Sequence, residues 1–211
     1  MRILTTCILL TTFIFTTNAQ LDWGSWTSFQ LNYKAGKKVT LTAKPIWRQR
    51  ADLAEYSNTS IDLIVGYKIN SKWSASILNR HWFIPEAPDR EFYFFDLNYK
   101  HPVKGKLSLS HKLRYHLIVN WGLKEPDFVR YNPQLNYKIK SKLTAILAAD
   151  WFYRVSDVRV LAGGRYKLGF NAILNAKTKL AFEYWRQIKH SDEYPIGRSN
   201  FLVLNLSYTL N

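Results

Sequence analysis

Basic side chains that alternate with other residue types along the chain are the groups best suited to chemistry in this sequence. They are Lys44, Arg48, Arg50, Arg80, Lys112, Arg114, Arg130, Arg154, Arg159 and Arg165. Acidic side chains in equivalent positions are fewer, namely Asp62, Asp96, Asp150 and Glu183. If all these positions face one interior, the guanidinium and ammonium groups together could bind or conduct anions.

Two interpretations of this charged set stay open. The acids could pair with the basic residues and fill a narrow interior as a structural ionic core. The excess of basic groups could instead line a pore or pocket that favours anionic solutes. The candidates for that lining are Arg48, Arg80, Arg114, Arg130, Arg154 and Arg165, with the four acids as their partners.

Serine, histidine and an acid could also form a hydrolytic site, as in barrel enzymes that modify lipids. The candidates are His111, His116, and "HSDE" at 190–193 with Ser199 nearby. His111 and His116 are an odd number of residues apart, so on one strand they point to opposite sides. The members of the second group are adjacent in a predicted loop, whereas a catalytic set is normally assembled by the fold. We therefore favour a non-enzymatic protein and keep the enzyme as an alternative.

The sequence predicts no metal site and no cofactor. His81 and His101 have no further ligands at metal-binding spacing, and the one cysteine is Cys7. The formal net charge of +15 fits nucleic acid, an anionic membrane surface or acidic ligands equally well. The aromatic content is more selective, because 8 Trp, 13 Tyr and 12 Phe favour surfaces that are half wet and half apolar.

The beginning of the chain is typical of an export signal. A basic residue precedes an apolar stretch at 3–15, and Ala19 supplies the small residue before a cleavage site. We expect a cleaved signal peptide at 1–19, which removes Cys7, and one mature domain at 20–211. The apolar stretch is too short to cross a membrane as a helix, and no later stretch reaches 18 apolar residues.

Apolar residues recur with a period of two through most of the mature chain. In the last run, Leu204 and Leu206 fall on one face and Asn205 and Ser207 on the other. Runs of about 10 to 13 residues exceed the usual strand length and suit the roughly 9 to 11 residues that a tilted strand needs to cross a bilayer. The runs are 24–34, 38–50, 58–69, 72–84, 91–101, 106–119, 128–139, 142–155, 157–168, 177–189 and 199–210.

Tyr-Lys pairs mark the ends of five of these runs. Their tyrosines are Tyr33, Tyr67, Tyr99, Tyr137 and Tyr166, and most are followed by a turn rich in Lys, Gly, Asn or Ser. Such turns predict hairpins, and a tyrosine there keeps its ring in an apolar layer and its hydroxyl in water. The five tyrosines therefore predict one aromatic girdle. An opposite girdle is predicted from Trp47, Trp82, Trp121, Trp151 and Trp185, except where strand parity turns them inward.

Long alternating strands, short turns on one rim and longer loops on the other predict an all-β, antiparallel transmembrane β-barrel. In this arrangement the short turns lie in the periplasm and the longer loops lie outside the cell. The eleven runs conflict with the even strand number of most bacterial single-chain barrels, so we expect 10 or 12 strands.

The whole mature chain resembles an uncharacterised family of Gram-negative outer-membrane barrels, known as domain of unknown function 2490. The resemblance rests on the start "WGSWTSFQLNYKAGKKVTL", on repeated "LxYKxxxKLxL" hairpins, and on the end "SNFLVLNLSYTLN". It implies the barrel fold and residence in the outer membrane. It supplies no activity and no functional residues.

We therefore expect a protein of the Gram-negative outer membrane, in contact with lipid and lipopolysaccharide and inserted by the barrel-assembly machinery. A lipid-facing exterior and an export signal argue against nucleic acid as a partner. The leading hypothesis is a structural barrel or one that passes small, preferably anionic, solutes. The alternatives are a lipid-modifying enzyme of the outer leaflet and a soluble lipocalin-like barrel, which would turn its apolar face inward.

Overall fold

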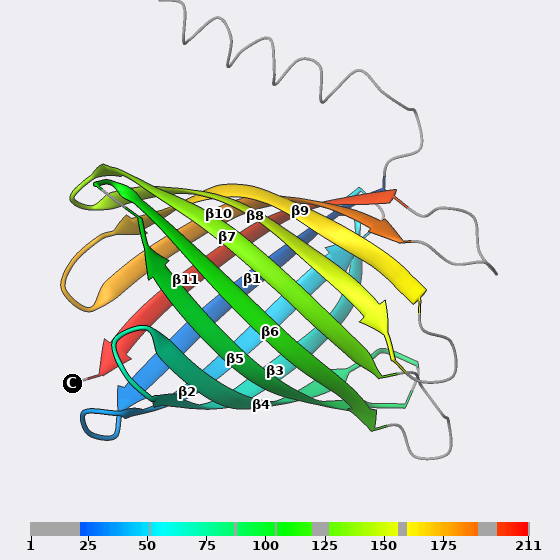
Figure 1. Cartoon of the computed structure of the whole chain (residues 1–211). Coiled ribbons are helices and arrows are strands. Elements are labelled where there is room, and N and C mark those ends of the chain that lie inside the picture. Colours follow the sequence, from blue (N-terminus) through cyan, green and yellow to red (C-terminus); the bar gives the residue numbers. More distant parts are fainter. Residues whose placement is uncertain are drawn as a thin grey trace, which may run out of the picture.

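The computed structural model contains eleven long strands that close into one barrel (Figure 1). It describes residues 22–50, 52–86, 88–103, 105–119, 127–155, 160–189 and 198–210. The strands are β1 (Asp22–Lys34), β2 (Val39–Arg50), β3 (Glu55–Lys68), β4 (Trp73–Phe83), β5 (Arg90–Pro102), β6 (Leu107–Val119), β7 (Phe128–Lys140), β8 (Leu143–Arg154), β9 (Val160–Ile173), β10 (Thr178–Lys189) and β11 (Arg198–Leu210). The expected signal peptide at 1–19 lies outside the described residues, as do Trp121, Arg159 and the segment 190–193.

The barrel closes through one parallel pair. Strands that follow one another along the chain pair antiparallel, whereas β1 and β11 pair parallel, from Asp22 opposite Ser199 to Tyr33 opposite Leu210. This follows from the strand number, because in an odd set of alternating strands the first and the last run the same way. The count of eleven lies between the 10 and 12 strands expected, and the all-antiparallel expectation fails only at this closure.

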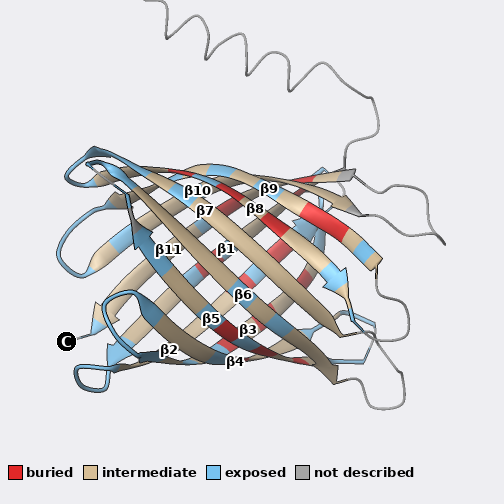
Figure 2. Cartoon of the chain, in the orientation of Figure 1, coloured by how far each residue is buried: buried red, intermediate tan, exposed pale blue. Residues whose placement is uncertain are grey.

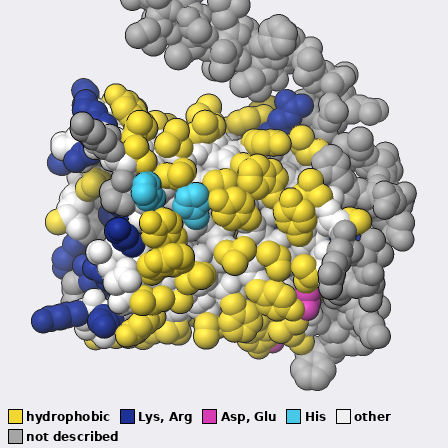
Figure 3. Space-filling model, viewed as in Figure 1, with side chains coloured by type: hydrophobic (Ala, Val, Ile, Leu, Met, Phe, Trp, Pro, Cys, Tyr) yellow, Lys and Arg dark blue, Asp and Glu magenta, His cyan; other side chains and the backbone are white. Residues whose placement is uncertain are grey.

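Most apolar side chains of the strands face outward, and the inward side chains are mainly polar, with a smaller apolar cluster of Leu78, Phe92 and Phe94 inside. Leu63, Ile77 and Leu147 are 52%, 54% and 58% exposed on the outer wall. On β3, Ser60 and Asp62 alternate with Ile61 and Leu63 and are 0% and 2% exposed. Figure 2 shows the buried positions distributed along the strands, and Figure 3 shows a largely hydrophobic outer wall. This orientation is the reverse of that in a soluble ligand-binding barrel.

Short turns connect the strands at one rim of the barrel, on the left in Figure 1. Two of them use the same device: the side-chain oxygen of Asn70 accepts hydrogen bonds from the backbone N–H of Lys72 and Trp73, at 2.8 and 2.9 Å. Asn175 does the same for the turn before β10. An Asn side chain that satisfies backbone donors in this way stabilises a tight turn.

No described helix is long and apolar enough to span a membrane.

Strand β9 is longer than the sequence predicted. It runs to Ile173, so Tyr166 lies in the middle of the strand and not at its turn. Gly169, just beyond the predicted end of the run at 168, is paired opposite Glu183 of β10. A Cβ atom at Gly169 would lie 2.3 Å from the carbonyl oxygen of Phe182. This glycine therefore serves a close approach of two strands, and the prediction of a girdle position for Tyr166 was wrong.

Candidate functional site

The inward side chains line a cavity of about 970 Å³ along the barrel axis. Ten basic and four acidic described residues contribute to its lining, a formal excess of six positive charges. All six arginines and all four acids proposed from the sequence are among them: Arg48, Arg80, Arg114, Arg130, Arg154, Arg165, Asp62, Asp96, Asp150 and Glu183. Lys167 also lines the cavity, and sequence reasoning missed it although it has the same strand parity as Arg165.

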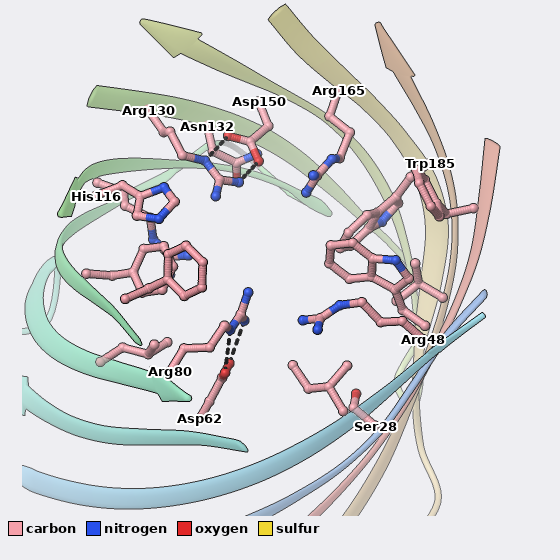
Figure 4. A pocket seen from close by; sticks show the side chains of 18 of the residues that line it. Ser28, Arg48, Asp62, Arg80, His116, Arg130, Asn132, Asp150, Arg165 and Trp185 are labelled. Atoms are coloured by element: carbon pink, nitrogen blue, oxygen red, sulfur yellow. Dashed lines mark hydrogen bonds and ion pairs between the residues drawn. The ribbon is translucent and has the colours of Figure 1, made fainter. Parts of the chain in front are cut away.

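Three arginines, on β4, β6 and β7, each form an ion pair with an aspartate on a neighbouring strand. Arg80 donates from Nε and Nη2 to the two carboxylate oxygens of Asp62, at 2.6 and 2.7 Å. Arg114 holds Asp96 in the same two-pronged way, with its Nη2 at 2.7 Å. The third pair, Arg130 with Asp150, is seen beside Asn132 in Figure 4. Such bidentate pairs fix both side chains and largely neutralise this part of the wall.

Strand register places these partners together. Asp62 and Arg80 lie directly opposite one another on β3 and β4, and Asp96 and Arg114 do so on β5 and β6. The ring of Phe94 lies between the two pairs, with the guanidinium carbons of Arg80 and Arg114 at 5.4 and 4.6 Å from its centroid. The phenylalanine thus contributes cation–π contacts that further hold the two arginines.

Arg48 and Arg165 differ from these three because no described carboxylate pairs with them. Arg165 donates from Nε and Nη2 to the amide oxygen of Gln187, at 2.9 and 2.7 Å. Arg48 donates from Nη1 to the amide oxygen of Asn58, at 2.5 Å. Both guanidinium groups extend into the cavity in Figure 4, where Arg80 and Arg130 approach from other strands. These two arginines therefore keep their positive charge uncompensated by a direct ion pair.

Tryptophan rings hold the two unpaired arginines in place. The guanidinium of Arg48 lies 4.6 Å from the centroid of Trp26 and 5.0 Å from that of Trp82. Arg165 lies 5.1 Å from Trp26 and 5.0 Å from Trp185. An arginine stacked on aromatic faces is pre-oriented without losing its charge.

The predicted girdle tryptophans divide between the two faces of the wall. Trp82 and Trp185 line the cavity, while Trp47 is exposed on the outer wall and Trp151 packs there against Tyr131. The inward tryptophans could have been found from their parity with the nearby charged residues, since Trp82 is two residues from Arg80 and Trp185 two from Glu183.

The tyrosines of the other predicted girdle lie close to the short turns, with Tyr166 as the exception. Tyr33, Tyr67 and Tyr137 are exposed on the outer wall, and Tyr99 packs there against Trp73 at 4.6 Å between ring centroids.

Between the charged residues of the lumen and the rim with the short turns, a chain of amide and hydroxyl groups continues the polar interior. Gln30 donates to Asn32, which accepts from Thr42 and donates to Ser207, each at 2.8 or 2.9 Å. These neutral groups satisfy one another across β1, β2 and β11. The inner surface is thus polar along its length, with the ion pairs and unpaired arginines concentrated in one part of it.

Of the residues considered for hydrolysis, the described ones are not brought together as a site. His116 faces the cavity and packs on Phe94, with 4.3 Å between ring centroids, whereas His111 lies on the outer wall and is hydrogen-bonded to Tyr131. Ser199 lines the cavity, and 190–193 is outside the described residues. Among the residues that the structure describes, no group of three or more His, Cys, Asp or Glu could hold a metal ion.

Comparison with known proteins identifies the family. A family model described as "Protein of unknown function (DUF2490)" matches residues 23–195. The chain belongs to the DUF2490 family. Among solved structures, one of the NanC porin is similar with a TM-score of 0.52 and 12% sequence identity, over 90% of this chain and 100% of that chain. At this identity the likeness shows the barrel fold alone. A search of the curated proteins found no match.

Proposed function

We propose that this DUF2490 protein resides in the outer membrane of a Gram-negative bacterium and lets small anions pass through its lumen. The apolar outer wall supports the membrane assignment, because a band of exposed leucine, isoleucine and aromatic side chains suits lipid and not water. The likeness to a porin supports it as well. In that setting lipid and lipopolysaccharide would contact the wall, and the barrel-assembly machinery would insert the chain.

The observation that carries the proposed passage is the charge of the lining. A cavity of about 970 Å³ remains after the side chains have packed, and ten basic residues face four acidic ones around it. Rings of Arg and Lys favour anions in a pore, since the low-dielectric wall leaves their field weakly screened.

The pairing of charges refines this proposal. Asp62, Asp96 and Asp150 are occupied by arginines, and Glu183 accepts a hydrogen bond from the indole N–H of Trp185 at 2.6 Å. Three of the four acids are therefore neutralised by arginines, and of the four only Glu183 keeps a charge without an ion pair among the described residues. The net positive field that remains comes from Arg48, Arg154, Arg165 and the lysines, is partly offset by Glu183, and favours anions.

Planar-bilayer recording tests the proposal. The purified mature barrel is inserted under a potassium chloride gradient, and the reversal potential gives the selectivity. We expect steady conductance with a reversal potential of the sign that a current carried mainly by chloride produces. Arg165→Gln should reduce this preference for chloride. The matched control is Arg186→Gln, which removes the same charge from β10 at a position paired with the outward Tyr166.

Insertion must be shown independently for this test to count. Protection of the strands from trypsin in vesicles and the mobility shift on heating in detergent gels report the folded, inserted barrel. Folded and inserted protein without conductance would mean a plugged lumen and would overturn the proposed passage. Cation selectivity, or an equal effect of Arg186→Gln, would contradict the role of the lumen charges.

A further inference from the structure

Six buried polar atoms lack a hydrogen-bond partner among the described residues, and four of them lie at neighbouring positions of three adjacent strands. The four are Nε and Nη2 of Arg48, Oγ of Ser60 and Nε1 of Trp82. The three residues belong to the adjacent strands β2, β3 and β4. Ser60 stands opposite both Trp82 and Ile46, the residue two before Arg48, so the atoms belong to one patch and not to scattered defects.

Burial makes these unpaired atoms unusual. Arg48 is 4% exposed and Ser60 is 0% exposed. Buried donors in folded proteins are almost always paired, because an unmade hydrogen bond in a poorly hydrated place costs free energy. Three of the four atoms are obligate donors, and the serine hydroxyl can donate as well. The patch is therefore built to receive acceptor atoms.

Charge decides which acceptor fits. Among the described residues, the guanidinium of Arg48 has only the neutral amide of Asn58 as a hydrogen-bonding partner, and Arg165 has only that of Gln187. Both arginines contact the same ring, Trp26, at 4.6 and 5.1 Å. Two uncompensated positive charges beside a patch of donors select an anion over a neutral acceptor.

Three other lumen arginines do not offer such a site. The forked donors of Arg80, Arg114 and Arg130 are already taken up by carboxylates of the chain itself. An incoming anion would have to displace Asp62, Asp96 or Asp150 from a bidentate pair. The patch at Arg48 needs no displacement.

We infer that Arg48 and Trp82, with Arg165 beside the shared Trp26, form a discrete binding site for an oxyanion such as a carboxylate or a phosphate group. The oxyanion accepts from Nε and Nη2 of Arg48 and from the indole N–H of Trp82. The carbon skeleton attached to it packs on the rings of Trp26 and Trp185, which line the same cavity. The site rests on the proposed anion passage. It would make that passage selective for anions that bind at the site, in addition to the selectivity that the lumen charge gives.

Calorimetric titration of the folded barrel in detergent micelles tests the site without requiring conduction. Acetate, benzoate and inorganic phosphate are the probes, so that the contributions of the charged group and of the ring are separated. We expect saturable binding, tighter for benzoate than for acetate because of the ring contacts. Arg48→Gln should weaken it at least tenfold.

Two matched pairs of variants make the result specific. Trp82→Phe keeps an aromatic ring but removes the indole donor, whereas Trp47→Phe makes the same change on the exposed outer wall. Arg48→Gln is compared with Arg186→Gln, which lies outside the lumen by its pairing with Tyr166. Weaker binding in the two lumen variants and unchanged binding in the two outer ones would support the site. Equal effects in both sets, or no saturable binding, would overturn it.

The proposed passage and the proposed site fail in different ways. Anion-selective conductance without saturable binding would leave the passage standing and remove the site. Saturable binding that depends on Arg48 and Trp82, in a barrel that conducts nothing, would leave the site standing and remove the passage.

Discussion

Replacing Leu204 by Arg should destabilise the inserted barrel much more than the same change at the next residue. Leu204 lies at the centre of β11, is 40% exposed on the outer wall, and pairs with Thr27 and Phe182. An arginine on the lipid face near the bilayer midplane costs about 2 to 4 kcal/mol, which corresponds to a loss of about 30- to 700-fold in the folding equilibrium.

Asn205 provides the control because it faces the lumen on the same strand. Its side-chain oxygen accepts a hydrogen bond from the hydroxyl of Ser28 at 2.8 Å. Asn205→Arg removes this bond and leaves the new charge in a polar cavity, so the expected cost is about 1 kcal/mol, or roughly fivefold. The two variants thus introduce the same charge at adjacent positions on opposite faces of β11.

The measurement is the urea-dependent unfolding and refolding of each variant in phospholipid vesicles, followed by tryptophan fluorescence. Leu204→Arg should lower the free energy of unfolding by several times as much as Asn205→Arg. Equal losses would show that the outer wall does not meet lipid. A reversed order would mean that the inward and outward faces of β11 have been exchanged.

Two further changes test the lumen and the wall. Asp150→Asn leaves Arg130 and Lys167 without their carboxylate, so we expect a loss of about 3 to 5 kcal/mol in the free energy of unfolding, partly recovered when Arg130→Gln is added. A double variant as unstable as Asp150→Asn alone would refute this. Gly169→Ala places a Cβ atom 2.3 Å from the carbonyl oxygen of Phe182 and should cost about 1 to 3 kcal/mol, more than Gly164→Ala, whose nearest contact is a side chain at 3.3 Å. Both are measured from urea midpoints.

The sequence predicted which way most side chains face because that information is local. A period of two places Leu204 and Asn205 on opposite sides of any strand, whatever the strand pairs with. Each of the eleven alternating runs became a strand for the same reason. The sequence also contains eleven runs, which is the strand number of the structure, although the usual even number favoured 10 or 12.

The pairing of charges could not be read in the same way. That Asp62 meets Arg80 depends on the register of β3 and β4, which the short turn around Asn70 sets. That Arg48 lacks a carboxylate depends on everything else in the lumen, which no single hairpin determines. The position of Tyr166 was mispredicted because a Tyr-Lys pair also occurs inside a strand, and the sequence does not show that β9 continues past Gly169 to Ile173.

The two interpretations of the charged residues apply to different parts of one wall. From β3 to β8, three Arg–Asp pairs form the ionic core that a narrow barrel needs. On β2 and β9, Arg48 and Arg165 have amides in place of acids as partners. If every arginine were paired, the lumen would have little field to select solutes. If none were, like charges in so small a space would oppose folding. Dividing the wall permits a stable barrel that still presents free guanidinium groups to an anion.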